Sequence, residues 1–257
     1  MSKKDEIQSH FVLVHGAFHG AWCWFKVATL LKAAGHKVTA LDLAASGVHR
    51  KQVHEIHSTS DYVEPLMEFM ASLPENQRVI LVGHSMGGLS IAEAMERFPH
   101  KISVAIFVTA IMPSPDFTPS EEFKGLSARM DGQYTFSNGP DNPPTSFLPS
   151  RHYLSSYLYQ LSPSEDLMLA TFLIRPVALN AIGMSSKKLT KEKYGSVSRV
   201  YIVCDEDASL PENVQRWMIE NNPPDEVNLI SGSDHMVMFT KPNELCTSLQ
   251  VITEKYC

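Results

Sequence analysis

The sequence predicts one α/β domain in which a mostly parallel, six-stranded sheet is flanked by helices and carries an inserted cap. Three observations point to this class. Short β-branched runs alternate with helical patterns along the chain, and most of these runs are continuously apolar, as in strands that are buried on both faces. The alternation breaks only once, near the middle. With 257 residues, 44% of them hydrophobic, the chain is long enough to build one sizeable core.

Six segments have the composition of buried strands, and the gaps between them are long enough for a crossover helix. These strand segments are Phe11–Val14, Val38–Leu43, Val79–Val82, Val104–Val108, Val200–Cys204 and Val227–Ile230. The helical patterns between or after them are Trp22–Ala34, Asp61–Ser72, Gly88–Arg97, Pro211–Asn221 and Glu244–Lys255. Strand followed by helix, repeated, predicts a doubly wound sheet.

The interruption runs from residue 113 to residue 188, and we expect it to form a mainly helical cap. The core would then consist of residues 1–112 and 189–257. Seven of the 16 prolines fall within residues 111–150, and one helical pattern, Ser164–Leu173, comes near the end of the interruption. Insertions of this length are usually functional, which favours a lid with an apolar underside over an insertion with its own small core.

Composition excludes several classes of partner. The net charge is −6 and no basic run occurs, so nucleic acid and anionic membrane surfaces are not expected partners. No apolar stretch approaches the roughly 20 residues that a membrane span requires. Four scattered cysteines without CxxC spacing predict free thiols, and the absence of a signal-peptide pattern agrees with a cytoplasmic protein. Homodimer formation is left open.

The most specific motif is Gly83-His-Ser85-Met-Gly87, which follows a buried strand and precedes a helix. This is the context of a nucleophile elbow, in which the serine hydroxyl is exposed on a very tight turn. Ser85 is therefore the candidate nucleophile, and the alternative is a chance glycine-rich turn. His84 is expected to line the pocket with its side chain directed away from the serine hydroxyl.

A serine hydroxyl needs a base, and the base needs an acid that fixes its tautomer. Three histidines follow Ser85 in the sequence. His100 falls in a surface turn and His152 in the cap, whereas His235 lies in the loop after the strand at 227–230. His235 is therefore the predicted base.

The acid is less clear from the residues alone. Asp205 and Asp207 both follow the strand at 200–204, and spacing does not distinguish them. Asp234 is too close in sequence to orient His235 from behind. Carboxylates that are not the acid are expected to serve loop solvation or turn capping.

A tetrahedral intermediate needs two donors directed at its oxyanion. The N–H of Met86, at the start of the helix after Ser85, is one candidate. The N–H of Ala17, in the loop after the first strand, is the other, because Gly16 allows a close approach of the backbone there. The neighbouring histidines 15 and 19 are expected to tie down this loop.

These residues resemble the plant methylesterase branch of the α/β-hydrolase superfamily, which also contains hydroxynitrile lyases, polyneuridine aldehyde esterase and methylketone synthases. The resemblance extends from near residue 10 to the C-terminus and rests on segments such as HFVLVHGAFHGAW, VILVGHSMGGLSIAEAME and GSDHMVMF. It implies an α/β-hydrolase fold with a cap over an apolar pocket. It also implies Asp207 as the triad acid and supports Ala17 and Met86 as the oxyanion donors.

Within this group, two positions disfavour lyase activity. Lyases that cleave cyanohydrins carry threonine and lysine where this chain has Gly16 and Met236. Methylketone synthases lack the nucleophilic serine, whereas Ser85 is present here. The resemblance thus implies a serine carboxylesterase for small apolar methyl esters, such as those of jasmonate, salicylate or alkaloid acids, with no metal and no cofactor. The alternatives are an esterase whose β-keto or β-aldehyde acid product decarboxylates, and a slow-turnover ligand receptor.

An apolar pocket is expected beside the serine. The residues predicted to line it are Phe18, His84, Phe107, Met130, Phe136, Phe147 and Leu210.

Overall fold

The computed structural model describes residues 8–114, 125, 129–181 and 189–257. Its central sheet has six strands in the order β2-β1-β3-β4-β8-β9, and every pairing is parallel. The predicted parallel sheet is confirmed, and its strands are β1 (His10–Val14), β2 (Lys37–Leu41), β3 (Val79–Ser85), β4 (Ile102–Ala110), β8 (Arg199–Cys204) and β9 (Glu226–Ile230). Because the strands are parallel, the loops that follow them meet at one edge of the sheet.

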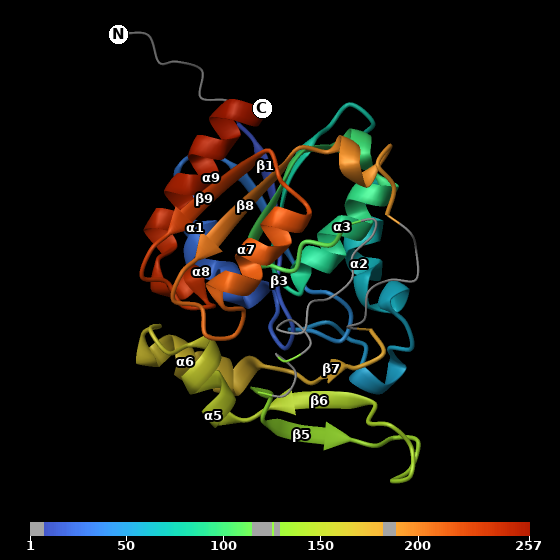
Figure 1. The fold of residues 1–257 in the computed structure, drawn as a ribbon. Coiled ribbons are helices and arrows are strands. Elements are labelled where there is room, and N and C mark those ends of the chain that lie inside the picture. Colours follow the sequence, from blue (N-terminus) through green and yellow to red (C-terminus); the bar gives the residue numbers. More distant parts are fainter. Residues whose placement is uncertain (1–7, 115–124, 126–128, 182–188) are drawn as a thin grey trace, which may run out of the picture.

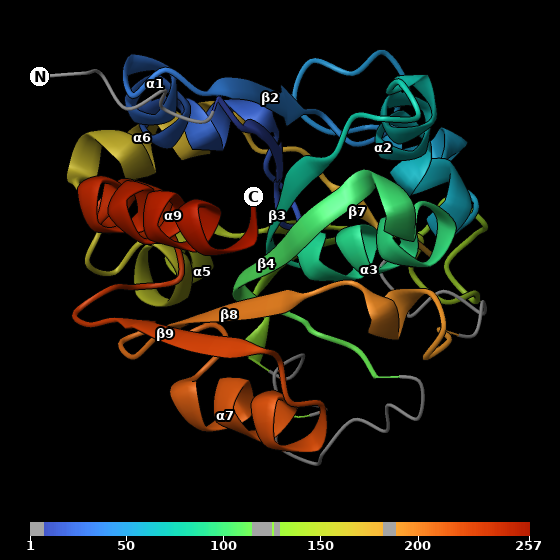
Figure 2. The ribbon, with the colours of Figure 1, turned by 90° about the horizontal axis from the view of Figure 1, so that it is seen from above.

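Helices cover both faces of the sheet (Figures 1 and 2). One face packs against α1 (Phe25–Ala33) and α9 (Pro242–Tyr256). The other packs against α2 (Thr59–Ser72), α3 (Gly87–Arg97) and α7 (Glu212–Asn221). Successive strand side chains alternate between the two cores, which is why the four inner strands are apolar at nearly every position.

Short helical turns join these elements. They are η1 (Ala21–Trp24), η2 (Val53–Glu55), η3 (Pro99–Lys101), η6 (Tyr194–Ser196) and α8 (Val237–Thr240).

The cap lies beyond the carboxyl edge of the sheet, at the bottom of Figure 1. Its helical part is α5 (Arg151–Tyr153), η5 (Leu154–Leu158) and α6 (Ser164–Leu173). It also contains an antiparallel sheet that the sequence did not predict, formed by β5 (Gly132–Thr135), β6 (Ser146–Pro149) and β7 (Val177–Ala178). Residues 115–124, 126–128 and 182–188 of the predicted cap lie outside the described residues, and so does its predicted C-terminal boundary.

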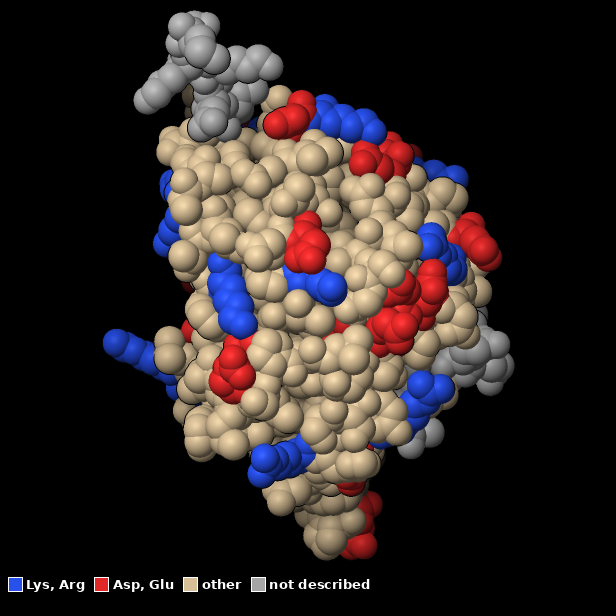
Figure 3. Space-filling model, turned by 90° about the vertical axis from the view of Figure 1, so that its left-hand side faces the viewer, with Lys and Arg blue, Asp and Glu red and all other residues tan. Residues whose placement is uncertain are grey.

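Charged side chains are dispersed over the face that carries α1, α9 and α6. Figure 3 shows its lysine and arginine side chains scattered, without a broad basic patch. Among the helices that the structure describes, none has both the length and the apolar character needed to cross a membrane.

Candidate active site

Ser85 ends β3, on the turn that leads into α3. Its φ is 53°, in the left-handed region that residues with a side chain rarely adopt. The turn is held tight by close backbone approaches. A Cβ on Gly83 would lie 2.9 Å from the carbonyl oxygen of Gly87, and a Cβ on Gly87 would lie 2.7 Å from that of His15. Only glycine fits at these two positions, so the chain adopts the elbow that the motif predicts.

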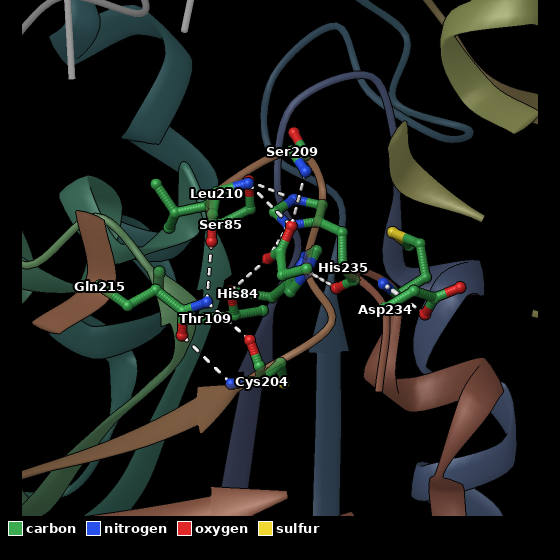
Figure 4. A network of polar contacts seen from close by, with 12 residues as sticks. His84, Ser85, Thr109, Cys204, Ser209, Leu210, Gln215, Asp234 and His235 are labelled. Atoms are coloured by element: carbon green, nitrogen blue, oxygen red, sulfur yellow. Dashed lines mark hydrogen bonds and ion pairs between the residues drawn. The ribbon is translucent and has the colours of Figure 1, made fainter. Parts of the chain in front are cut away.

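Ser85, His235 and Asp207 form a continuous chain of hydrogen bonds, part of the network in Figure 4. Ser85 Oγ lies 2.9 Å from His235 Nε2, and His235 Nδ1 lies 2.6 Å from Asp207 Oδ2. The three residues come from the ends of three strands: β3, the loop after β9 and the loop after β8. His235 and Asp207 are buried. With Nδ1–H donating to the carboxylate, Nε2 is free to take the proton of the serine hydroxyl.

The Asp207 carboxylate is held by donors on both of its oxygens. The backbone N–H groups of Ser209 and Leu210 donate to Oδ1 at 2.8 and 2.7 Å. The Thr109 hydroxyl, at the end of β4, donates to Oδ2 at 2.5 Å. These bonds fix the orientation of the carboxylate toward His235, which is the positioning that the acid of a triad provides.

Asp205 is directed elsewhere, although it lies only two residues from Asp207. Its carboxylate accepts hydrogen bonds from the Ser231 hydroxyl at 2.6 Å and from the Gly232 N–H at 2.7 Å. Asp205 therefore caps the loop that precedes His235, as expected for a carboxylate that is not the acid.

Asp234 has a role that the sequence did not indicate. Asp234 is fully buried, so of the two roles expected for a carboxylate that is not the acid, loop solvation and turn capping, only turn capping applies. The carboxylate accepts hydrogen bonds from both the cap and the histidine loop. The donors are Leu161 N, Ser162 Oγ, Met236 N and Thr240 Oγ1. A buried charge needs such partners because it has lost its water.

The loop after β1 brings Ala17 to the serine. Ala17 and Met86 both line the pocket that contains Ser85 and His235. Met86 directly precedes α3, so its N–H lies at the positive end of that helix dipole. This arrangement suits two backbone donors for an oxyanion.

His15 and His19 hold this loop in place, as expected. His15 Nδ1–H donates to the Gly16 carbonyl at 2.7 Å, and its Nε2 accepts from the Leu43 N–H at 3.0 Å. His19 Nδ1–H donates to the Ala17 carbonyl at 2.7 Å. Burial lowers the pKa of both imidazoles, that of His19 to about 3, so each ring is neutral and can accept through its second nitrogen.

His84 lines the pocket and packs against the predicted base. Its Nε2–H donates to the His235 carbonyl at 2.8 Å, and the two rings lie 4.7 Å apart. Burial, followed by the nearby His235 ring, lowers the pKa of His84 well below its usual value. A neutral His84 thus supports the backbone of His235 and places no positive charge beside the His235 ring.

The pocket has a volume of about 300 Å³ and is lined mainly by apolar side chains. Four of the residues predicted to line it do so: Phe18, His84, Met130 and Leu210. The others are Gly16, Ala17, His19, Ser85, Met86, Ile111, Tyr153, Leu158, Ser209 and His235. A volume at the lower end of the usual range for ligand pockets suits a small substrate.

Three predicted pocket residues lie elsewhere. Phe107 is buried in the middle of β4 and faces the core under α2 and α3. Phe136 follows β5 and is 45% exposed. Phe147 is buried in β6 behind Phe18, with its ring 5.8 Å from the Phe18 ring. The sequence shows that these positions are aromatic, but not which face of a strand or of the cap each one occupies.

Two polar lining residues were missed. The Tyr153 hydroxyl, from the cap, lies 3.2 Å from Ser209 Oγ, from the acid loop. Ser209 could have been found from its position two residues after Asp207, because residues after a parallel strand share the carboxyl edge of the sheet. Tyr153 carries no such signal, since its place depends on how the cap folds over the core.

Other nucleophiles and metal ligands are not gathered at this site. Within the described part of the chain, no three His, Cys, Asp or Glu side chains form a metal-binding group. All four cysteines are unpaired, and burial raises the pKa of the Cys23 and Cys204 thiols well above the usual value. Buried, protonated thiols are poor nucleophiles.

The chain is similar to known proteins over nearly its whole length. A family model described as "Alpha/beta hydrolase family" matches residues 11–247. The chain is 58% identical to methyl jasmonate esterase 1 of Vitis vinifera, over 98% of this chain and 99% of that protein. Among solved structures, tomato methylketone synthase I complexed with 2-tridecanone superposes with a TM-score of 0.92 at 49% identity, covering 98% of this chain and all of that one. Polyneuridine aldehyde esterase superposes with a TM-score of 0.89 at 43% identity, covering 96% and 99% of the two chains.

Proposed function

The chain belongs to the alpha/beta hydrolase family, and we propose that it is a serine esterase that hydrolyses methyl esters of small, largely apolar carboxylic acids. The observation that carries this proposal is the hydrogen-bonded series from Ser85 through His235 to Asp207 on the wall of an apolar pocket. The likeness to methyl jasmonate esterase and polyneuridine aldehyde esterase supports the same reaction class.

Acylation begins when Ser85 Oγ attacks the ester carbonyl and His235 Nε2 takes the hydroxyl proton. The carbonyl oxygen becomes an oxyanion, which the N–H groups of Ala17 and Met86 stabilise. Asp207 holds the protonated ring in place. His235 then returns the proton to the methoxy oxygen, and methanol leaves the acyl-enzyme.

Deacylation repeats these steps with water. His235 Nε2 takes a proton from the water as its oxygen attacks the acyl carbon, and the proton then passes to Ser85 Oγ as the acid is released. Side chains and backbone amides of this chain carry out every transfer, so the mechanism calls for no metal and no cofactor.

The pocket favours a small apolar acyl group. Phe18, Met130 and Leu210 contribute apolar surface, and the limited volume suits acids of the size of jasmonic, salicylic or simple alkaloid acids. The residue after His235 is Met236, which is buried and uncharged, so it supplies no cation for a cyanide leaving group. This disfavours a hydroxynitrile lyase. The unpaired cysteines support a reducing compartment, and we place the reaction in the cytoplasm.

A panel of methyl esters tests the proposal. Methyl jasmonate, methyl salicylate, methyl indole-acetate and a methyl β-keto ester are incubated with wild-type protein and with Ser85→Ala, and methanol release is measured. We expect turnover of at least one ester by the wild type and a loss of about 10⁴-fold or more in the variant. Carbon dioxide release from the β-keto ester reports whether decarboxylation follows hydrolysis. Ligand-induced thermal stabilisation without methanol release would contradict the proposal and favour a receptor.

A further inference from the structure

Four consecutive cap residues contact all three loops that carry the candidate catalytic groups. These residues, Tyr159 to Ser162, connect η5 to α6, and we call them the clamp. The loops that they contact are the oxyanion loop after β1, the acid loop after β8 and the histidine loop after β9. Each contact is a hydrogen bond, so each has a defined direction.

The first contact reaches the oxyanion loop. The Tyr159 hydroxyl lies 2.6 Å from His19 Nε2, and both side chains are buried. His19 donates its Nδ1–H to the Ala17 carbonyl, so Nε2 is the acceptor and the tyrosine hydroxyl is the donor. The two rings also stack, with centroids 5.8 Å apart. Tyr159 therefore fixes the ring that holds the residue carrying an oxyanion donor.

The second contact reaches the histidine loop through Asp234. The Leu161 N–H and the Ser162 hydroxyl donate to one oxygen of this buried carboxylate, at 3.0 and 2.7 Å. Its other oxygen accepts from the Met236 N–H at 3.1 Å. One carboxylate thus joins the cap to the residues on either side of His235.

The third contact reaches the acid loop. Gln160 Nε2–H donates to the carbonyl oxygen of Glu206 at 2.6 Å. Glu206 directly precedes Asp207, so this bond restrains the backbone that carries the acid.

Another cap contact has no such connection. Lys26 on α1 pairs with Asp166 on α6, with 2.5 Å between Nζ and Oδ2. This ion pair also fastens the cap to the core, but it joins two helices, and Lys26 Nζ lies 5.6 Å from the centre of the Phe239 ring in α8, beyond the histidine loop. The Lys26–Asp166 pair is therefore a control for the clamp: both attach the cap to the core, but only the clamp is bonded to the loops that carry the catalytic groups.

We propose that the clamp is a positioning segment, which sets the relative placement of the oxyanion donor, the acid and the histidine around Ser85. The inference rests on the proposed function, because it requires Ser85 to be the nucleophile. The cap then does more than enclose the pocket: without the clamp, the serine would remain in its elbow while the groups around it lost their alignment.

A fluorophosphonate probe tests this independently of the preferred ester. Ser85 Oγ attacks phosphorus, fluoride leaves, the hydroxyl proton passes to His235 and the phosphoryl oxygen takes the oxyanion position. The second-order labelling rate is measured for wild type, Tyr159→Phe, Ser162→Ala, Ser162→Thr and the control Asp166→Asn. Melting temperatures, and kcat and KM on p-nitrophenyl acetate, are recorded for the same proteins.

We expect Tyr159→Phe and Ser162→Ala to label about tenfold more slowly than wild type, with kcat lowered in parallel and KM changed by less than about twofold. Ser162→Thr should recover most of the rate because it restores the hydroxyl. Asp166→Asn should lower the melting temperature but leave labelling and kcat near wild type. Clamp variants that label at the wild-type rate would overturn the inference alone, as would an equal loss in Asp166→Asn. A wild-type protein that neither labels nor hydrolyses any ester would overturn the proposed function together with the inference.

Discussion

The elbow after β3 and the oxyanion loop after β1 lie side by side at the same edge of the sheet, yet they are held in different ways. The elbow is shaped by its own residues, with Gly83 and Gly87 on either side of the strained Ser85. The oxyanion loop is held by its own residues His15 and His19 and, in addition, by distant parts of the chain. Tyr159 binds His19, and the Arg175 N–H donates to the Phe18 carbonyl at 2.9 Å.

This difference shows that some groups of the site are positioned by the local sequence and others by tertiary contacts. The nucleophile is placed by a short motif and its strand, so it is specified locally. The groups that would stabilise charge on the substrate are placed by tertiary contacts, some of them from the cap. The acid loop is held largely in the first way, because Asp207 accepts hydrogen bonds from amides two and three residues along the chain.

The largest expected effect comes from the acid loop. Asp207→Asn keeps the shape of the side chain but allows its amide to face His235 Nδ1, which favours the wrong tautomer, and kcat should fall by about 10⁴-fold. Asp205→Asn is the matched control, because the Asp205 carboxylate is hydrogen-bonded to Ser231 and Gly232 and not to His235. It should change kcat by less than about threefold. Steady-state hydrolysis of p-nitrophenyl acetate measures both, and the reverse order would show that Asp205 is the acid.

A second variant changes Gly16, where the oxyanion loop packs against the elbow. A Cβ on Gly16 would lie 2.8 Å from Ser85 Cβ and 3.1 Å from His84 Nδ1. Gly16→Ala must therefore push the oxyanion loop away from the elbow, and kcat should fall by about 10²-fold.

The control for this change is Gly195→Ala. Its new Cβ would meet no atom closer than 3.7 Å, so kcat and melting temperature should stay near wild type. If Gly16→Ala kept full kcat, the oxyanion loop would be more adaptable than the close approach implies.

The smallest effect concerns stability and tests how firmly the oxyanion loop is held. Burial lowers the pKa of His19 from 6.5 to about 3, so between these values the unfolded chain binds a proton that the folded chain does not. Stability therefore falls as the pH falls through this window, by up to about 1.4 kcal/mol per pH unit from this residue. His19→Asn should remove that contribution.

Urea unfolding of wild type and His19→Asn at pH values from 7.5 down to 4.5 measures the difference. The gap between the two free energies of unfolding should be constant above pH 7 and should change steadily below 6.5. Parallel curves over the whole range would mean that His19 binds its proton as readily in the folded protein as in the unfolded one. Other buried histidines, among them His15, retain part of the slope in both proteins.

Sequence reasoning succeeded where structure is determined locally. Largely apolar, β-branched runs identified every strand of the central sheet, because a parallel sheet covered on both faces leaves few polar positions along its inner strands. The Gly83 and Gly87 spacing identified the elbow for a similar reason. The position of His235 after the last strand placed it at the same edge as Ser85.

It failed where position depends on contacts between distant segments. The cap sheet pairs Phe147 with Val177, a partner far along the chain, and no short pattern announces such a pairing. The sequence predicts Phe107 in the pocket, but its side chain is buried in the core under α2 and α3. An apolar run does not show to which face of the sheet a given side chain points. The turn-capping role of Asp234 follows from nearby residues, but its bonds to Leu161 and Ser162 do not, since those partners lie in the cap.

The left-handed backbone at Ser85 has a consequence for how such a chain can change over generations. Glycine adopts that conformation without the cost of about 1 kcal/mol or more that a side chain incurs. Exchanging the serine for glycine would therefore relieve this backbone strain while removing the nucleophile. In a lineage that is no longer selected for turnover, the backbone conformation at residue 85 would favour glycine over serine. The result would be a protein that binds its ligand without hydrolysing it.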